Sequence, residues 1–290
     1  MALALLTSAS QAQQAYPTPE DAVAALSAAV KSGTKTSILK VLGNGAEDVV
    51  ESGDEVADAE TRQRFLSAYD ARHSIKTEGN KKAVLILGAD DFPFPIPLVN
   101  SKSGWEFDTD QGRIEILYRR IGHNELDAIQ TCLAFVDAEN EYADKDRGDG
   151  AGVYAQRIVS TPGKKDGLFW RDDRDPSPLG ELAAQASAEG YKVDGQGAPY
   201  HGYYFRILQG QGPDAPGGAF NYVVKGKMIG GFALIAYPAE YGNSGVMTFL
   251  VNHAGTVYQK DLGNRTEAIA RRVTRFDPDQ TWKKVDAAKP

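Results

Sequence analysis

Twice along this chain, segments with the hydrophobic period of an α-helix give way to segments with the composition of β-strands. The first change comes after Ser74 and the second at about His201. Strands that follow helices as a block, instead of alternating with them, favour an antiparallel sheet. We therefore expect an α+β fold in which helices pack on antiparallel β-meanders. Its two sub-domains should span residues 16–122 and 123–285.

The helices expected in the first sub-domain have recognisable ends. Thr18 and the Pro19 that follows it are typical of a helix N-terminus, and Gly33 ends the apolar stripe of this helix. A shorter helix is expected over residues 36–42, and a third with Asp58 as its N-cap.

Two strands, residues 82–87 and 105–108, are expected after these helices. Pro93, Pro95 and Pro97 lie between the two strands. Because proline lacks an amide donor, this segment is expected to be an edge strand or an extended wall. Such a wall could line a groove, or it could block edge-to-edge aggregation.

The second sub-domain is expected to open with a long helix that has Asn124 as its N-cap and ends near Ala143. Its apolar face should include Leu126 and Ile129. A further helix is expected over residues 177–190. Four short strands separated by turn residues should then form an antiparallel meander: residues 203–207, 232–236, 246–250 and 256–258.

The composition is that of a globular protein, with 42% hydrophobic and 24% charged residues among 290. The 32 Lys and Arg residues are scattered, and with 39 Asp and Glu residues the net charge is -7. Because nucleic-acid binding needs clustered basic residues, no nucleic-acid partner is expected. No stretch approaches 18 consecutive apolar residues, so no transmembrane segment is expected in the mature chain.

The N-terminus suggests export. A short apolar run, residues 2–6, is followed by Ser10 and Ala12, which fit the small-residue positions of a signal-peptidase site. No Lys or Arg precedes the run, so residues 1–12 are interpreted as a truncated signal peptide, with a frayed Ala-rich N-terminus as the alternative. The first interpretation predicts a periplasmic or otherwise exported protein.

Cys132 is the single cysteine of the chain, so no intramolecular disulfide and no cysteine-based metal site can form. It lies among apolar residues of a helical pattern, where a thiol usually behaves as a small buried hydrophobe.

Asp144, Asp146 and Asp149 form the candidate metal site. Carboxylates on a Gly-rich turn can converge on Ca²⁺, which takes six to eight oxygen ligands. An EF-hand loop would need a glutamate at its twelfth position, which here is Ala155. The alternative is a solvated acidic turn after the long helix. Apart from Ca²⁺ at this loop, the sequence implies no cofactor.

No catalytic constellation is recognisable. The turn of residues 242–245 resembles the nucleophile turn of chymotrypsin-like proteases, but a serine nucleophile needs a positioned histidine base. None of the four histidines has the flanking residues of such a base, and a tight hairpin between two strands accounts for the glycines.

Several motifs resemble those of a known family: SGD at 52–54, FPFP at 92–95, RRIGHNEL at 119–126, STPGKKDGL at 160–168, YHGYYF at 200–205, and the run from AYP to QKDLG at 236–263. The family is domain of unknown function family 2950, which consists of uncharacterised exported bacterial proteins. The resemblance covers nearly the whole chain after Tyr16. It implies export and brings no assigned activity.

The second half is also similar to the globular heads of type IV pilin-like proteins. The similarity rests on a helix leading to residues 141–143, then Tyr154 and Ala155, and then a meander. The apolar membrane-spanning start of a pilin helix is absent here, which argues against filament assembly by the pilin route.

These observations favour a non-catalytic envelope module that binds or helps to assemble an unknown envelope protein. An exposed aromatic patch of Tyr203, Tyr237 and Tyr241 would be its contact surface. The alternative is a periplasmic hydrolase with an unrecognised carboxylate site. That alternative predicts a deep pocket with two carboxylates whose pKa values are shifted.

Overall fold

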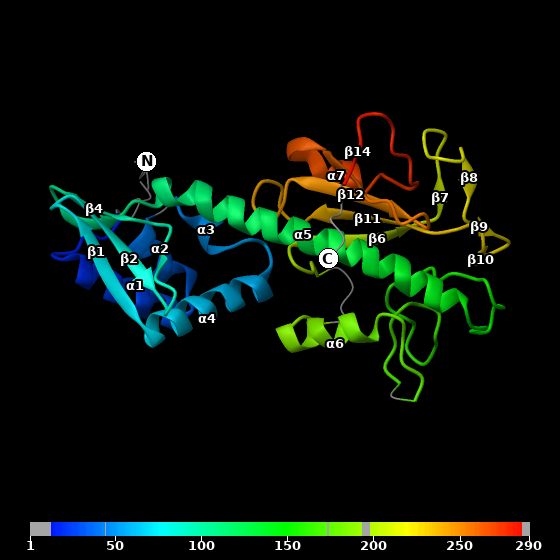
Figure 1. The fold of residues 1–290 in the computed structure, drawn as a ribbon, viewed down its shortest axis with the longest axis horizontal. Coiled ribbons are helices and arrows are strands. Elements are labelled where there is room, and N and C mark those ends of the chain that lie inside the picture. The colour runs from blue at the N-terminus through cyan, green and yellow to red at the C-terminus, as the bar shows by residue number, and fades with distance from the viewer. Residues whose placement is uncertain (1–12, 44, 173, 193–197, 286–290) are drawn as a thin grey trace, which may run out of the picture. The chain divides into compact units, whose positions relative to one another are not determined.

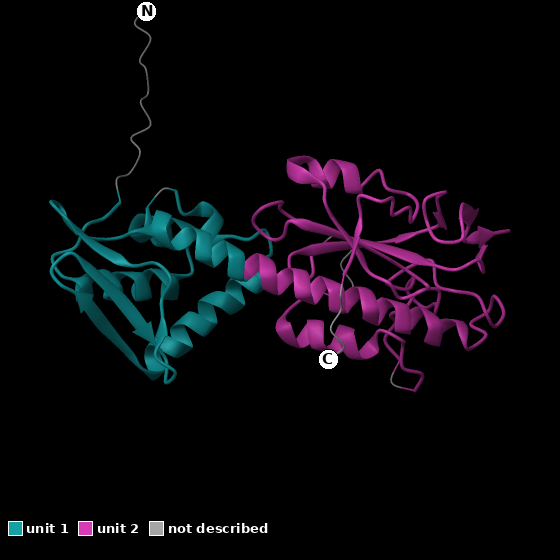
Figure 2. Ribbon diagram, turned by 45° about the horizontal axis from the view of Figure 1, so that its top comes forward, with its two compact units in different colours: residues 1–119 teal, residues 120–290 magenta. Residues whose placement is uncertain are grey.

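The computed structural model describes residues 13–43, 45–172, 174–192 and 198–285. The chain divides into unit 1, residues 1–119, and unit 2, residues 120–290 (Figure 2). Helices and antiparallel sheets occur in both units, which confirms the α+β class. The division falls inside helix α5 (Thr109–Ala143), three residues before the boundary expected from the sequence.

The helices of unit 1 before α5 are α1 (Pro19–Ser32), α2 (Lys35–Leu42), α3 (Glu47–Val50) and α4 (Glu55–Ala71). The expected ends of α1 are confirmed. The Thr18 hydroxyl accepts a hydrogen bond from the Asp21 amide at 3.1 Å, and Gly33 ends the helix at a φ of 66°. This left-handed conformation is one that glycine adopts without steric cost.

The expected start of the third long helix was wrong. Helix α4 has Asp54 as its N-cap, and the Asp54 carboxylate accepts from the amides of Val56 and Ala57, both at 3.1 Å. Asp58 lies in the first turn, where its carboxylate accepts from the Ser52 amide at 3.0 and 3.1 Å. Both aspartates therefore satisfy backbone donors near one helix end, so residue type alone could not separate their roles.

The sheet of unit 1 is antiparallel, with the order β1-β2-β4-β5 and with β3 paired to β2. Its strands are β1 (His73–Glu78), β2 (Lys82–Leu87), β3 (Phe92–Pro93), β4 (Leu98–Ser101) and β5 (Gly104–Phe107). Alternate residues of β2, including Leu85, enter the core that the helices cover. The proline-rich segment contributes only the two paired residues of β3, as expected of an edge strand.

Unit 2 is built on an antiparallel sheet with the order β14-β13-β12-β11-β6 (Figure 1). Its strands are β6 (Tyr203–Leu208), β11 (Ala233–Pro238), β12 (Met247–Asn252), β13 (Tyr258–Asp261) and β14 (Lys283–Lys284). Two short hairpins pair β7 (Gly210–Gln211) with β8 (Phe220–Asn221) and β9 (Val223–Val224) with β10 (Lys227–Met228). The other helices are α6 (Gly180–Glu189), the 3₁₀-helix η1 (Gly263–Arg265) and α7 (Thr266–Ala270).

Both faces of this sheet are covered. All six residues of β11 are buried. On β6, Phe205 faces the side of α5, whereas the Arg206 guanidinium reaches the carbonyls of Ala270 and Val273 at and after the end of α7. Since neighbouring residues of a strand point to opposite faces, α5 and α7 lie on opposite sides of the sheet.

Two expectations for the long helix were wrong. Helix α5 begins at Thr109, so Asn124 lies inside it instead of capping it, and the Asn124 side chain donates to the Ser244 carbonyl at 2.8 Å. Leu126 is 63% exposed, because the buried face of α5 runs through Ala128, Cys132 and Phe135. The polar side chain of Asn124 resembles a cap in sequence, but it serves a contact between α5 and a turn of the sheet.

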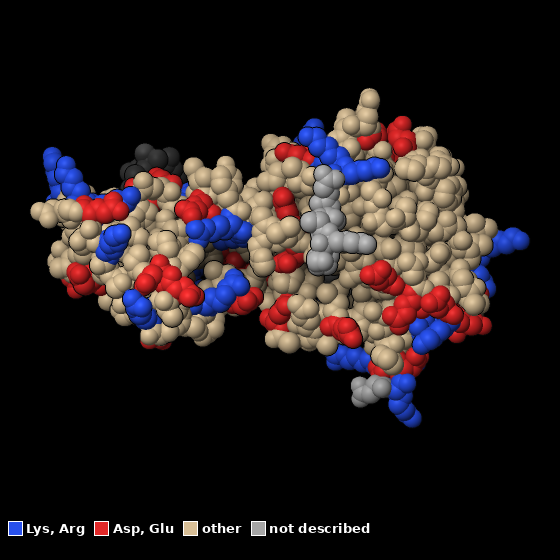
Figure 3. Space-filling view, viewed as in Figure 1, with Lys and Arg blue, Asp and Glu red and all other residues tan. Residues whose placement is uncertain are grey.

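No helix within the described residues is long and apolar enough to cross a membrane. The proposed signal peptide, residues 1–12, lies outside the described residues. On the face shown in Figure 3, lysine and arginine side chains stand singly or in small groups among acidic ones. This face therefore offers no basic patch of the kind that nucleic acids require.

Candidate ligand-binding site

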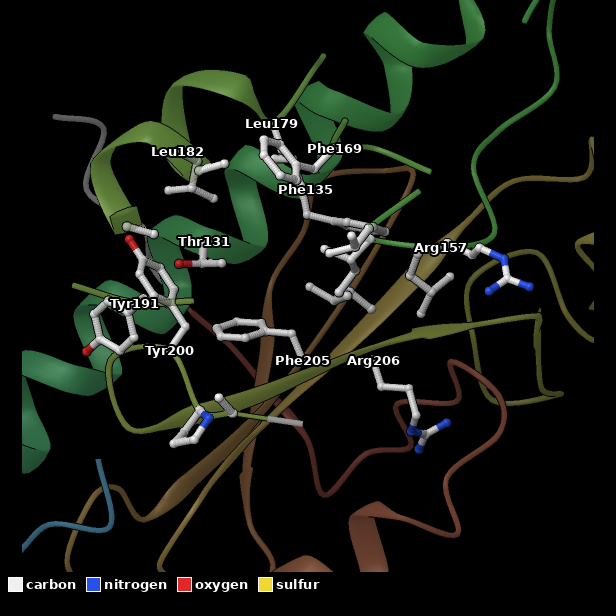
Figure 4. A pocket seen from close by; sticks show the side chains of 18 of the residues that line it. Thr131, Phe135, Arg157, Phe169, Leu179, Leu182, Tyr191, Tyr200, Phe205 and Arg206 are labelled. Atoms are coloured by element: carbon white, nitrogen blue, oxygen red, sulfur yellow. The ribbon is translucent and has the colours of Figure 1, made fainter. Parts of the chain in front are cut away.

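Unit 2 contains a cavity of about 490 Å³ beside α5, α6 and β6, which we call the apolar cavity (Figure 4). Most of its lining is hydrophobic, including Phe135, Phe169, Leu179, Leu182, Phe205 and Leu234. Among the described residues that line it, none carries a carboxylate. The size and chemistry are those of pockets that bind small apolar molecules.

Regular spacing brings these side chains together. Thr131 and Phe135 lie one turn apart on α5, and Leu182 and Ala186 stand in the same relation on α6. Phe205 lies on the sheet side of the cavity, where its ring points inward in Figure 4, while Arg206 points away. The cavity thus lies between the helices α5 and α6 and the strands β6 and β11, and loop residues such as Arg157 and Pro199 complete its lining.

Two tyrosines stand at one end of the apolar cavity. The rings of Tyr191 and Tyr200 meet edge to face, with 4.9 Å between their centroids (Figure 4). Burial, followed by the charges of Glu189 and Asp127, raises the pKa of the Tyr200 hydroxyl. Tyr200 is therefore neutral at physiological pH.

A polar cluster adjoins these tyrosines. The His201 imidazole lies with Nε2 3.1 Å from Glu189 and Nδ1 3.4 Å from Asp127. His123 approaches the same Asp127 oxygen at 3.3 Å. His201 has a φ of 46°, a left-handed conformation that residues other than glycine adopt rarely. The His201 ring lies 4.2 Å from that of Tyr200, centroid to centroid, which places the cluster next to the cavity.

The sequence alone did not reveal this cluster. His123 and Asp127 are four residues apart on one helix, a spacing that could have paired them. The histidine at 201 and the glutamate at 189 come from distant segments, and no local pattern connects them to α5.

A second cavity, of about 420 Å³, also lies in unit 2, and we call it the polar cavity. Its lining includes Tyr142, Arg147, Asp149, Tyr154 and Asp166. It shares two lining residues, Gln156 and Arg157, with the apolar cavity. The two cavities therefore adjoin along this short segment.

A buried carboxyl group lies behind the polar cavity. Glu139 of α5 is fully buried, and its Oε2 accepts from the amide of Ala155, which lines the cavity, at 2.8 Å. Its Oε1 has no hydrogen-bond partner. Burial raises the pKa of Glu139 well above 4.5, although the bond from Ala155 opposes the shift. The carboxyl group is therefore held as the neutral acid.

The three aspartates of the candidate metal site lie near this cavity. Asp146 Oδ1 accepts from the amides of Gly148 and Gly150, both at 2.8 Å, and these two bonds lower its pKa. Asp149 Oδ1 lies 3.8 Å from the ammonium of Lys227. Within the described part of the chain, no group of three His, Cys, Asp or Glu residues is arranged to hold a metal ion. Ca²⁺ binding at Asp144, Asp146 and Asp149 stays a prediction.

Other sequence expectations meet a clear outcome. Ser244 is buried, and its hydroxyl donates to the Glu240 carbonyl at 3.2 Å, which confirms a structural turn. The prediction of an exposed aromatic patch was wrong, because Tyr203 and Tyr237 are buried on the sheet. Cys132 is fully buried, which confirms the expected burial, and burial raises the pKa of its thiol to about 12.

Comparison with known proteins adds a family and no activity. The model of a family described as Protein of unknown function (DUF2950) matches residues 13–285. No curated protein and no solved structure matches the chain.

Proposed function

Because the chain belongs to the DUF2950 family, whose description assigns no function, we propose from the geometry of the site that it is a non-catalytic binding module. Its ligand would be a small apolar molecule, such as an acyl chain, held in the apolar cavity. The observation that carries this proposal is a cavity of about 490 Å³ with a largely hydrophobic lining.

The polar groups around this cavity suit recognition rather than chemistry. Tyr200 is neutral, and the Arg206 guanidinium is already bonded to two carbonyls beside α7. A ligand in the cavity would thus meet mainly aromatic and aliphatic surface, with the side chains of Lys192 and Arg157 as further cations of the lining. Such a lining binds by excluding water from apolar area.

A binding experiment tests the proposal. The fluorescence of the neutral probe N-phenylnaphthylamine should rise when it enters the cavity, and dodecanol should displace it. Ala183→Trp, which fills the cavity from α6, should weaken probe binding by about tenfold or more, through steric exclusion. Ala184→Trp is the matched control, because Ala184 is exposed on the same helix. Absence of probe binding, or equal effects of both variants, would contradict the proposal.

We also propose that the module is exported and acts in the envelope, in contact with an envelope protein. The support is the sequence pattern of residues 1–12. The likeness of the second half to pilin-like heads is a proposal of the same kind, supported by the packing of α5 on the antiparallel sheet of unit 2. Mass spectrometry of the protein from the periplasmic fraction tests export: an N-terminus at Gln13 is expected, and a retained N-terminus would contradict it.

The alternative of a periplasmic hydrolase is supported by the two carboxylates on either side of His201. The expectation of a pocket with two carboxylates of shifted pKa also has some support, because the pKa of Glu139, bonded to the cavity-lining Ala155, is raised and that of Asp166 is lowered. In the polar cavity, burial raises the pKa of Asp166, but the hydrogen bonds from Thr161 outweigh it, so that the net shift is downward. An esterase and glycosidase screen in which Asp127→Asn removes activity would favour this alternative.

A further inference from the structure

The polar cavity contains a buried cation with an unused donor. The side chain of Arg147 is 5% exposed, and its guanidinium lies over the rings of Tyr142 and Trp170, 5.1 and 4.6 Å from their centroids. Its Nε donates to the Tyr142 carbonyl, and its Nη1 lies 3.8 Å from Asp175. Its Nη2 is buried without a hydrogen-bond partner.

A buried charged donor without an acceptor destabilises a protein, so such groups usually have a partner in the working state. Arg147 lines the polar cavity, and an acceptor bound there would satisfy it. An anionic oxygen suits best, because charge-assisted hydrogen bonds are the stronger ones.

The carboxyl groups nearby do not bond to Nη2. Asp175, at 3.8 Å from Nη1, is held by the ammonium of Lys165 at 2.7 Å. Glu139 is held as the neutral acid, so it brings no negative charge. The two oxygens of Asp166 accept from the amide and the hydroxyl of Thr161 at 2.7 and 2.8 Å. The side chain of Asp149 is 69% exposed and lies beside Lys227.

The polar cavity also borders the apolar one. Gln156 and Arg157 line both, so the two cavities meet at this segment, which a ligand that occupies both would have to cross. Arg157 is exposed and lies 3.9 Å from Asp166, which leaves its guanidinium close to the border between the cavities.

We infer that the polar cavity binds the acidic head group, carboxylate or phosphate, of an amphiphile whose apolar chain occupies the apolar cavity. This inference rests on the proposed function. It adds the chemical class of the ligand, and it assigns Arg147 as the residue that recognises the head group, with Arg157 at the border.

The test compares ligands that share a chain and differ in their head. Binding of dodecanoic acid, dodecyl phosphate and dodecanol to the full chain is measured by displacement of the neutral probe at neutral pH. We expect at least one of the two acids to bind about tenfold more tightly than the alcohol, because of the hydrogen bond to Arg147. The tighter of the two acids identifies the head group.

Arg147→Met keeps the apolar stem of the side chain and removes the guanidinium. We expect it to abolish the preference for the acid and to leave dodecanol binding unchanged. Arg171→Met, at an exposed arginine outside both cavities, is the matched control and should keep the preference. If Arg147→Met does not fold, the comparison of acids and alcohol on the unmodified protein decides alone.

The outcomes separate the two proposals. Equal affinity for both acids and the alcohol would overturn the head-group inference and leave the apolar-ligand function standing. A preference for the acid that Arg147→Met retains would also overturn the role of this arginine. Failure of all three ligands to bind would overturn the proposed function and, with it, this inference.

Discussion

The two units differ in how their buried ionisable side chains are satisfied. In unit 1, the carboxylates of Asp54 and Asp58 are buried, and both accept hydrogen bonds from backbone amides around the start of α4. In unit 2, Glu139 and Arg147 are buried, and each keeps a polar atom without a partner. The buried carboxylates of unit 1 therefore bond to the backbone, whereas Glu139 and Arg147 of unit 2 each keep a polar atom that a ligand could bond.

The sheets of the two units also differ in how far their strands are buried. The edge strand β1 of unit 1 is mostly exposed, whereas β11 of unit 2 is buried along its whole length. Both cavities described above lie in unit 2. A sheet covered on both faces can enclose a ligand between strand and helix, and unit 2 has the layers to do so.

The largest expected effect tests whether the two units unfold independently. Leu85→Ala removes a fully buried side chain of unit 1, and Phe249→Ala does the same in unit 2. Each should destabilise its own unit by about 2–5 kcal/mol, through lost burial and the cavity that remains. Calorimetry should show one transition lowered by each variant, and only Phe249→Ala should weaken probe binding. Equal shifts of every transition by both variants would break the comparison.

A second test concerns pH. The pKa of Glu139 is raised above 4.5 by burial, so between this value and its folded pKa the native state holds a proton that the unfolded state has lost. The contribution of Glu139 to stability is thus complete below the unfolded pKa and declines as the pH rises towards the folded one. Glu139→Gln cannot ionise, so its stability relative to the unmodified protein should grow by up to about 1.4 kcal/mol per pH unit.

Urea unfolding of Glu139→Gln and of the unmodified protein, from acidic to weakly alkaline pH, measures this difference. Glu141→Gln is the control, because Glu141 is exposed on the same helix. A stability difference that does not change with pH would show that Glu139 is not held as the neutral acid.

A smaller effect is expected at the buried carboxylate of unit 1. Asp54→Ala removes the two hydrogen bonds to the amides of Val56 and Ala57 and should destabilise the protein by about 1 kcal/mol. Asp54→Asn should restore most of this loss, since asparagine caps helices about as well as aspartate. Denaturant midpoints measure both variants. No recovery with asparagine would mean that the charge, and not the cap, matters here.

The smallest expected effect belongs to the predicted calcium site of unit 2. At a Ca²⁺ concentration equal to its Kd, a bound ion stabilises the native state by about 0.4 kcal/mol. A chelator should therefore lower the melting temperature slightly, and only for the transition of unit 2. The same treatment of Asp144→Asn should have less effect. A melting curve that the chelator leaves unchanged would contradict Ca²⁺ binding at these aspartates.

Local signals made parts of the fold predictable. Thr18, Pro19 and Gly33 mark the ends of α1 because capping depends on neighbouring residues only. The start of α5 was missed, since Asn124 has the composition of a cap and its partner, Ser244, lies far along the chain. Gly112 is also unusual inside a helix. It lets α5 pass close to Ile96, because a Cβ at this position would lie only 2.7 Å from the Ile96 Cγ1.

The site was less predictable than the fold. Glu139 offered one signal that could have been used, because it interrupts the apolar face of α5 between Phe135 and Tyr142. Arg147 offered none, since its burial depends on rings at positions 142 and 170 that meet only in the folded state. Cavities arise from tertiary packing, which periodicity does not describe.

Cys132 is a natural probe of how often unit 2 opens. It is the single cysteine of the chain, it lies in the core of unit 2, and its thiol has a pKa of about 12. A thiol-specific reagent can therefore react only when unit 2 opens, so the rate of labelling reports how often that opening occurs. Ligand binding to unit 2 should slow the labelling of Cys132, whereas a substitution or unfolding confined to unit 1 should leave the labelling rate unchanged.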